Sequence, residues 1–280
     1  MTIKATLQVA EMTLVGRMST NEAKFEAQLL LQQVLKVNLA WLIAHADDAL
    51  SDDVRASFDR LIKRRLWGEP IAYILGYREF YGLPFKVTSD TLIPRPDTET
   101  LVNLAITKIT QNQSCNILDL GTGSGAIGLT IAKYLPKSHI TAVDVCENAL
   151  NIALENAKNL AINNVTFILS DWFERLSHRT FDLIISNPPY IEMNDLHLTQ
   201  GDVRFEPINA LVSGPDGLDD IRHIITNSPY FLNTNGWLML EHGYNQADKV
   251  RRLLIKENFI DITSIKDLGN HERVTVGLKI

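Results

Sequence analysis

The sequence has few cysteines, no long apolar run and no excess of positive charge. Its 280 residues include only Cys115 and Cys146, with no Cys-x-x-Cys pair and no Cys/His spacing typical of metal sites. We therefore expect reduced thiols and no metal. No apolar run reaches the length of a membrane span, and the N-terminus lacks the basic-then-apolar pattern of a signal peptide. These absences predict a soluble, cytoplasmic protein with no membrane partner.

Charge is spread unevenly along the chain. The formal net charge is −6, and residues 1–75 hold nine Lys/Arg and nine Asp/Glu, so residues 76–280 carry 18 − 24 = −6. A nucleic-acid-binding domain usually has a basic footprint, which these totals lack. The cluster of Arg60, Lys63, Arg64 and Arg65 is more typical of a solvated helix face. We therefore expect no direct nucleic-acid partner.

The length and the 45% hydrophobic content favour two domains. Residues 1–75 predict a small helical bundle domain, in which the apolar spacing of 22–35 is helical and Thr20 or Asn21 is the expected N-cap. Residues 76–93 mix aromatic residues with Gly76, Gly82 and Pro84, which predicts a β-hairpin linker.

Residues 94–280 alternate between strand and helix patterns, which predicts an α/β fold with a mostly parallel sheet covered by helices on both faces. No helix separates the last two strands, so we expect one reversed strand near the edge of the sheet. The predicted strands are 116–120, 139–143, 165–169, 181–186, 237–241, 260–266 and 274–279, and the predicted helices are 126–134, 147–161, 216–232 and 246–258.

A glycine-rich loop follows the first strand of this region. Asp119-Leu120 runs into Gly121, Thr122, Gly123, Ser124 and Gly125 before a helix, so backbone amides can approach a ligand closely. Asp144 ends the next strand, where a carboxylate can accept hydrogen bonds from both hydroxyls of a ribose. The pattern predicts a nucleotide-like cofactor.

Two cofactors fit this loop. Gly123-x-Gly125-x-x-Gly128 matches the dinucleotide pattern literally, whereas Gly121-x-Gly123-x-Gly125 after an acidic residue is the pattern of S-adenosylmethionine enzymes. The glycine directly after the strand is Gly121, and Asp119 suits a cationic methionine group better than a pyrophosphate. The residues therefore favour S-adenosyl-L-methionine.

The most informative motif is Asn187-Pro188-Pro189-Tyr190, which follows the apolar strand 181–186. Ligands of open α/β sheets lie at the carboxyl ends of strands. The prolines lack N–H groups, the Asn187 oxygen is an acceptor, and Tyr190 offers a flat ring. Such a turn suits a planar group that carries an NH2, such as adenine, cytosine or a side-chain amide.

The two motifs together resemble the amino-group methyltransferases. Within that group, the chain resembles the release-factor glutamine N5-methyltransferase family (HemK/PrmC type). Four further segments carry this resemblance, namely 68–73, 78–82, 94–99 and 272–275. The resemblance covers the chain from about residue 68 to the end, and it implies a Rossmann-like S-adenosylmethionine methyltransferase domain. It further implies methyl transfer to the side-chain amide of the glutamine in the Gly-Gly-Gln motif of class-1 peptide chain release factors, with S-adenosyl-L-homocysteine as product.

The resemblance also implies roles for particular residues. Asp119, Gly121, Thr122, Gly123, Ser124 and Gly125 would contact the cofactor, Asp144 would hold its ribose, and Asp171 and Trp172 would flank its adenine. Asn187, Pro188, Pro189 and Tyr190 would bind the substrate amide, with Asn187, Pro188 and Tyr190 as the catalytic set and Asn187 also next to the cofactor. Residues 1–75 would dock the protein substrate, and we expect a monomer.

Two other functions use the same features. A DNA adenine-N6 methyltransferase uses the same four-residue turn on a flipped base, but the charge is acidic and no target-recognition domain is evident. A non-catalytic release-factor-binding protein needs neither the intact loop nor the turn.

Overall fold

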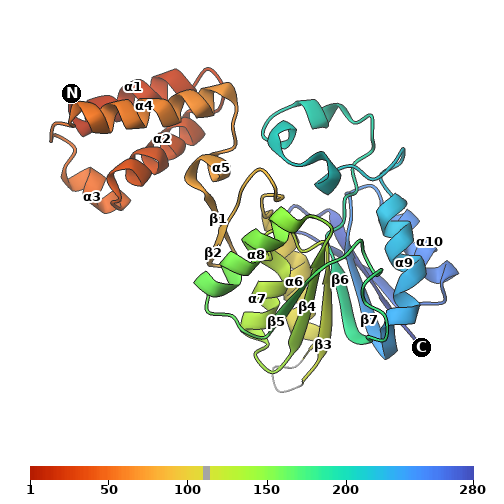
Figure 1. Cartoon of the computed structure of the whole chain (residues 1–280). Coiled ribbons are helices and arrows are strands. Elements are labelled where there is room, and N and C mark those ends of the chain that lie inside the picture. Colours follow the sequence, from red (N-terminus) through yellow and green to blue (C-terminus); the bar gives the residue numbers. More distant parts are fainter. Residues whose placement is uncertain (110–113) are drawn as a thin grey trace. The chain divides into compact units, whose positions relative to one another are not determined.

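The computed structural model describes residues 1–109 and 114–280, and these form two compact units. One unit, here called the helical unit, comprises Met1–Gly76 together with Gln200–Phe205, and the other, the sheet unit, comprises Tyr77–Thr199 and Glu206–Ile280. Figure 1 labels most of the elements of both units.

The helical unit is a bundle with its own apolar core. Its helices are α1 (Ile3–Leu14), α2 (Thr20–Leu35), α3 (Leu39–Ala44), α4 (Asp52–Trp67) and α5 (Ile71–Leu75). Leu14, Leu30 and Leu31 are fully buried, because apolar residues at helical spacing meet at the bundle centre. The N-cap of α2 is Ser19, not Thr20 or Asn21 as the sequence predicted. Ser19 and Glu22 form a reciprocal capping box, which satisfies amides that Thr20 as N-cap would leave unpaired.

The segment 200–205 packs within the helical unit, which nothing in the sequence pattern predicts. Asp202 accepts a hydrogen bond from Arg65 (3.2 Å), a residue that also pairs with Glu26. Arg204 donates to the backbone oxygen of Trp67 (2.9 Å), and the Trp67 ring meets Phe205 edge to face. These contacts close the end of α4.

The sheet unit begins with the hairpin β1 (Tyr77–Phe80) and β2 (Leu83–Lys86), which pair antiparallel. Its main sheet contains β3 (Asn116–Leu120), β4 (His139–Asp144), β5 (Val165–Leu169), β6 (Phe181–Ser186), β7 (Leu232–Glu241), β8 (Ile260–Lys266) and β9 (Glu272–Leu278). Its α-helices are α6 (Glu99–Lys108), α7 (Ala126–Tyr134), α8 (Glu147–Asn159), α9 (Asp219–Phe231) and α10 (Ala247–Lys256). Short 3-10 turns lie at Pro96–Thr98, Leu196–Thr199 and Ile208–Ala210.

The strand order is β5-β4-β3-β6-β7-β9-β8, and all neighbours are parallel except at β9. The sequence prediction of a mostly parallel Rossmann-like sheet with one reversed strand near the edge is confirmed. The reversed strand is β9, because only a short connection joins it to β8 and a parallel crossover needs a longer one.

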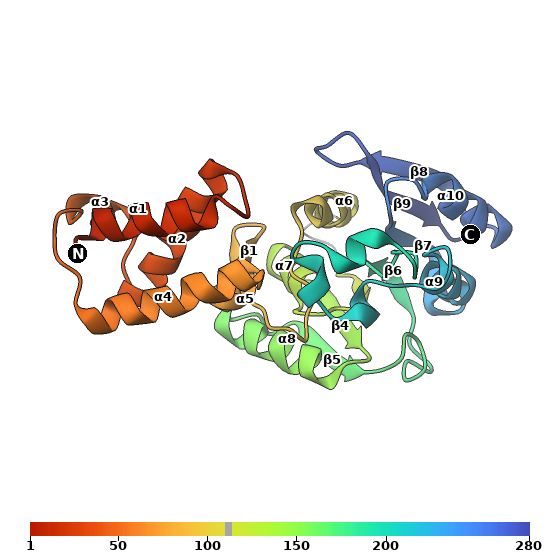
Figure 2. The same cartoon turned by 90° about the horizontal axis from the view of Figure 1, so that it is seen from above.

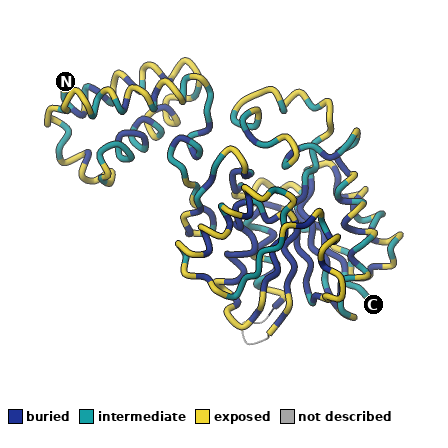
Figure 3. The backbone as a smooth tube through the Cα atoms, viewed as in Figure 1, coloured by how far each residue is buried: buried dark blue, intermediate teal, exposed yellow. Residues whose placement is uncertain are grey.

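Each face of the sheet has its own apolar core. On β3, Ile117 packs with α6 and α7 whereas Leu118 packs with α9 and α10, since successive strand residues point to opposite faces. Helices α9 and α10 lie next to each other (Figure 2). The inner strands are buried, whereas β5 and β8 at the two edges of the sheet are partly exposed, and exposed residues follow the outer helix surfaces and loops (Figure 3). Because the helices cover the two faces of the sheet, the carboxyl ends of the parallel strands stay open for a site.

Candidate active site

The residues singled out in the sequence lie at the carboxyl ends of four adjacent parallel strands. In the order of the sheet, Asp171 follows β5, Asp144 ends β4, Gly121 follows β3 and Asn187 follows β6. Parallel strands bring their carboxyl ends to one edge, so residues up to 66 positions apart become neighbours.

The glycine loop is held from below by Asp119. The Asp119 carboxylate is fully buried and accepts hydrogen bonds from the Thr122 hydroxyl (2.6 Å) and the Gly128 amide (3.0 Å). Burial raises its pKa to about 6, and the two hydrogen bonds oppose that rise. A Cβ on Gly128 would lie 2.7 Å from Asp119 Oδ2, so this close approach requires glycine. Asp119 therefore shapes the loop and is not among the residues that line the cavity described below, and its contact with the cofactor stays a prediction.

Asp144 is tied to the same loop from the neighbouring strand. Its carboxylate accepts hydrogen bonds from the Gly123 amide (2.8 Å) and from the Cys146 amide (2.9 Å). Burial raises its pKa, and the backbone hydrogen bonds counteract this. A carboxylate has about four acceptor positions, so room remains for hydroxyl donors of a ligand.

A cavity of about 260 Å³ opens over these strand ends. Its lining includes seven of the predicted residues, namely Gly121, Gly123, Asp144, Asp171, Trp172, Asn187 and Pro189. Six other predicted residues are not among those that line the cavity: Asp119, Thr122, Ser124, Gly125, Pro188 and Tyr190. Thr122 and Ser124 are buried, and Gly125 is the N-cap of α7. The loop and the turn thus face a common space, but only part of each motif reaches it.

The cavity is acidic. Asp90, Asp144, Asp171 and Asp220 line it, and within the described chain no lysine or arginine belongs to the lining. A pyrophosphate would bring negative charge next to four carboxylates without a compensating cation, which costs free energy at this burial. A sulfonium carries positive charge and suits the same surroundings. The geometry therefore favours the cationic cofactor over the dinucleotide.

Trp172 and Gly121 lie against each other in the cavity lining. A Cβ on Gly121, at φ +69°, would lie 3.6 Å from the Trp172 ring, so a side chain at this position would crowd the ring. Trp172 thus adds an aromatic ring to the lining, and such a ring can stack on a flat group.

The turn after β6 is anchored at both ends. Asn187 Nδ2 donates to the Thr98 hydroxyl (3.2 Å), and the Tyr190 hydroxyl donates to Glu241 Oε1 (3.3 Å). Because Nδ2 is engaged, Asn187 Oδ1 is the end of the amide left for a ligand. Pro188 is buried between them. Burial raises the pKa of Tyr190, so its hydroxyl stays protonated and can only act as a donor to the carboxylate.

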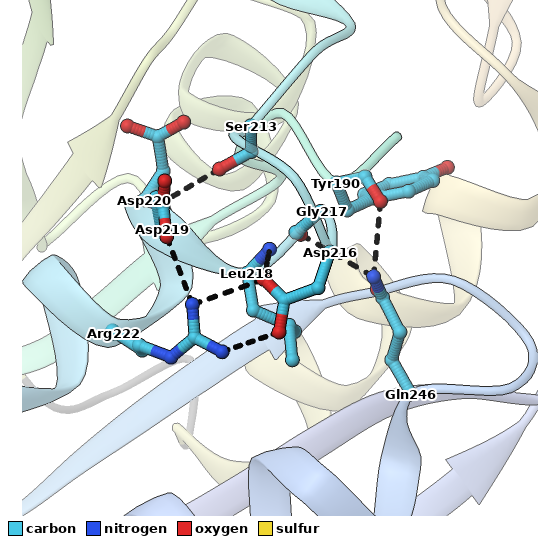
Figure 4. A network of polar contacts seen from close by, with 9 residues as sticks. All are labelled: Tyr190, Ser213, Asp216, Gly217, Leu218, Asp219, Asp220, Arg222 and Gln246. Atoms are coloured by element: carbon cyan, nitrogen blue, oxygen red, sulfur yellow. Dashed lines mark hydrogen bonds and ion pairs between the residues drawn. The ribbon is translucent and has the colours of Figure 1, made fainter. Parts of the chain in front are cut away.

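A second network holds the backbone of Tyr190 (Figure 4). Gln246 Nε2 donates to the backbone oxygens of Tyr190 (3.0 Å) and Gly217 (3.3 Å). Asp216, next to Gly217 in the loop, pairs with Arg222 of α9. The Asp220 amide, at the start of α9, donates to the Ser213 hydroxyl (2.8 Å). Asp220 lines the cavity, so this network connects the back of the turn to the cavity wall.

Sequence reasoning missed two segments of the lining. Asp90–Leu92 and the residues Pro207, Asn209 and Ala210 both face the cavity. Glu206 joins them, because its buried carboxylate accepts from the Ile93 amide (3.0 Å) and pairs with Arg95. A glutamate and an arginine 111 positions apart carry no local signal of this pairing.

No group of three or more metal-ligating side chains is present in the described ranges 1–109 and 114–280. Among the same residues, no helix has the length and apolar character needed to cross a membrane.

Comparison with known protein families gives two matches along the chain. Residues 97–203 match the methyltransferase small domain, and residues 6–76 match the PrmC N-terminal domain. A protein of Vibrio cholerae called release factor glutamine methyltransferase is 48% identical over 277 residues, which is 99% of this chain and 96% of that protein. The protein of the same name from Escherichia coli K12 is 46% identical over 252 residues, 90% of this chain and 91% of its own length.

Solved structures share the fold at low identity. A methyltransferase from Pyrococcus furiosus has a TM-score of 0.54 with 18% identity, covering 78% of this chain and 96% of that one. The Thermus thermophilus 16S rRNA N2 G1207 methyltransferase, in complex with AdoMet and guanosine, has a TM-score of 0.51 with 18% identity. The match covers 73% of this chain and 50% of that one.

Proposed function

The chain belongs to the release factor glutamine methyltransferase family, and on that premise we propose how its cavity and its turn carry out methyl transfer. It transfers a methyl group from S-adenosyl-L-methionine to the side-chain amide nitrogen of a glutamine in a peptide chain release factor, leaving S-adenosyl-L-homocysteine. The acceptor is the glutamine of the Gly-Gly-Gln motif in class-1 release factors.

One observation carries the proposal for the site. The free Oδ1 of Asn187 and the four acidic residues belong to one cavity, so an amide and a cationic methyl donor can meet there. The donor set fits S-adenosyl-L-methionine, which supplies a methyl group made electrophilic by a positive sulfur. Gly121 and Gly123 would admit its methionine part, Asp144 would hold its ribose, and Asp171 and Trp172 would flank its adenine.

The protein's own task is alignment. An amide nitrogen is a poor nucleophile because its lone pair is delocalised into the carbonyl. Asn187 Oδ1, in the cavity lining, would accept one N–H of the substrate amide, and the Pro188 carbonyl, between the lining residues Asn187 and Pro189, would accept the other, which turns the nitrogen lone pair toward the methyl group. Both oxygens also stabilise the positive charge that develops on the nitrogen. Tyr190 supports the amide plane, and the proton leaves to solvent after the transfer.

The competing DNA adenine methyltransferase is tested by following a labelled methyl group. Full-length protein and labelled cofactor are incubated with a class-1 release factor or with duplex DNA. We expect the label in the release factor and none in DNA. Label that enters DNA alone would overturn the proposal, and label in neither substrate, with normal cofactor binding, would favour the non-catalytic binding protein.

The helical unit is proposed as the docking module for the release factor. A glutamine on a loop offers few contacts, so further binding energy must hold the substrate. The unit carries exposed apolar side chains, among them Met12 on α1 at 78% exposure, which are candidate contacts for a partner. In the full chain, Met12→Asp should raise KM for the release factor and leave cofactor affinity unchanged. An unchanged KM, together with an unchanged KM for Phe25→Asp on α2, would contradict this role.

We further propose that the protein acts in the cytoplasm as a monomer and needs no nucleic acid. Release factors act in the cytoplasm, and an acidic chain has no basic footprint for nucleic acid. Light scattering at the concentration of the activity assay tests whether the protein is a monomer. Loss of activity after nuclease treatment would contradict the proposal that no nucleic acid is needed.

A further inference from the structure

The catalytic turn rests on buried polar groups that the mechanism above does not use. Thr98, directly before α6, is 4% exposed, and its hydroxyl oxygen accepts the hydrogen bond from Asn187 Nδ2. Glu241, at the end of β7, is 1% exposed and accepts the hydrogen bond from Tyr190. Thr98 thus holds the Asn187 end of the turn, and Glu241 holds the Tyr190 end.

Thr98 and Glu241 also act on each other. The Thr98 hydroxyl lowers the pKa of Glu241, so it lies near that carboxylate, although no hydrogen bond of normal geometry joins the two in the described residues. Glu241 Oε2 is buried and has no partner of normal hydrogen-bond geometry within the part of the chain that the structure describes. A buried carboxylate oxygen without a partner costs free energy, so it favours a proton directed at it from a neighbouring hydroxyl such as that of Thr98.

The hydroxyl of Thr98 has one proton to donate. When that proton points at the Glu241 carboxylate, the Thr98 oxygen is left only with acceptor positions. It can then meet the NH2 end of Asn187 and not the oxygen end. The two ends of an amide differ little in shape, so this polarity decides which end of Asn187 faces the cavity.

We propose that Thr98 and Glu241 are positioning residues that hold the Asn187 amide with its oxygen toward the substrate. The inference rests on the proposed function, because the oxygen matters only if a substrate NH2 must be aligned. Neither residue lines the cavity, so neither touches the substrate there.

The Thr98 hydroxyl can direct its proton at Glu241 only while the Glu241 carboxyl group is ionised. Burial raises the pKa of Glu241 to about 7, while Thr98, the positive charge of Arg273 and the Tyr190 hydroxyl lower it and Asp97 raises it. Arg273 comes from β9 and is held by Asp97 (3.3 Å) and Asp267 (3.1 Å). A protonated Glu241 becomes a donor and reverses the polarity at Thr98, so the geometry predicts a turnover that declines as pH falls through neutrality.

The first experiment compares Thr98→Val, Thr98→Ser and Thr130→Val in the full-length enzyme with a release factor. Valine keeps the shape of threonine but has no hydroxyl, and serine keeps the hydroxyl. Thr130 is the matched control, since it is equally buried on α7 and its hydroxyl donates only to the Ala126 backbone oxygen. Thr98→Val should lower kcat about two- to tenfold, the effect of one lost hydrogen bond, with cofactor affinity unchanged by calorimetry.

Serine at position 98 should restore most of the lost kcat, and Thr130→Val should match the wild type. The inference is wrong if Thr98→Val keeps the wild-type kcat, or if serine restores nothing although the fold is intact by circular dichroism. Failure of the proposed function looks different, because the wild type itself would then methylate no glutamine.

The second experiment measures kcat against pH for the wild type and Glu241→Gln. Glutamine does not titrate, so the decline of kcat below about pH 7 should flatten in the variant. A variant that keeps the wild-type acidic limb would overturn the role of Glu241. The pH dependence of Glu241→Gln tests the inference even if Thr98→Val does not fold.

Discussion

The amide nitrogen of Gly123 donates a hydrogen bond to the Asp144 carboxylate across 2.8 Å, which fastens the glycine loop after β3 to the end of β4. The two elements that we propose bind parts of the cofactor therefore hold one another in place. A change at either one is expected to alter both the loop and the ribose contact.

Asp144→Ala should weaken binding of S-adenosyl-L-methionine about ten- to a hundredfold. Hydrogen bonds to a charged group contribute roughly 1.5–3 kcal/mol, and the variant also frees the Gly123 amide. Isothermal titration calorimetry checks this, with Asp144→Asn as a partner variant that keeps an acceptor and should lose less. Wild-type cofactor affinity in Asp144→Ala would show that this acid does not bind the ribose.

Gly128→Ala should also weaken cofactor binding, although Gly128 lies outside the cavity lining. The added Cβ would stand 2.7 Å from Asp119 Oδ2 and displace the carboxylate that holds Thr122. The account predicts a lower melting temperature together with a higher cofactor Kd. A variant that loses stability but binds cofactor with normal Kd would separate the Asp119 contacts from the loop.

The stability of the cofactor-free protein should decrease as pH rises from about 4 to about 7. Glu241, with a pKa of about 7, and Asp119, with a pKa of about 6, bind protons more tightly in the folded chain than in the unfolded chain. Protonation therefore stabilises the fold inside this window, and the gain disappears as pH passes the folded pKa values. The lowered pKa of the buried His242 acts in the opposite direction below about pH 6.5, and the lowered pKa of Asp267 does so at more acidic pH, so the effect of Glu241 is read from a comparison with Glu241→Gln.

For Glu241 alone the contribution is on the order of 3 kcal/mol. Urea unfolding at about pH 5 and about pH 8 measures the difference. Glu241→Gln removes this titration, so its unfolding free energy should depend less on pH than that of the wild type. Equal pH slopes for the two proteins would contradict the buried acid as the cause.

The strand ends could be predicted from the sequence because their signals are local. The apolar run 181–186, the glycines after Asp119 and the acid at position 144 lie within a few residues of the elements that present them. The strands 116–120, 165–169, 181–186 and 260–266 match the structure at both ends.

The support behind the site was not predictable in this way. Glu241 meets Tyr190 from 51 positions away, and Arg95 meets Glu206 from 111 positions away. Only the fold brings these residues together, and each is an ordinary charged residue in its own neighbourhood. The placement of 200–205 in the helical unit depends on Asp202 and Arg65, which are also distant in the chain.

Gly217→Ala should reduce turnover more than stability alone explains. Gly217 has φ +71°, and its Cβ would overlap the backbone oxygen of Tyr190, which is the oxygen that Gln246 holds (Figure 4). The displaced Tyr190 should lower kcat with little change in cofactor affinity.

Gly82→Ala is the matched control for this variant. Gly82 has φ +74° and open space around its Cβ position, so it shares the left-handed strain of about 1–2 kcal/mol without the clash. It should lower the melting temperature and keep kcat near the wild type. Equal kcat losses in both variants would attribute the effect to strain and not to Tyr190.

The central claim is that Asn187 aligns a glutamine amide for methylation. The most direct measurement is mass spectrometry of the glutamine-containing peptide of a class-1 release factor after incubation with the full-length enzyme and cofactor. We predict one added methyl group on the glutamine side chain with the wild type, and a rate about a hundred- to a thousandfold lower with Asn187→Ala, comparable to loss of one oxyanion-hole donor. Asn187→Asp, which keeps the acceptor, should retain some activity. Near-normal methylation by a folded Asn187→Ala variant would contradict the account.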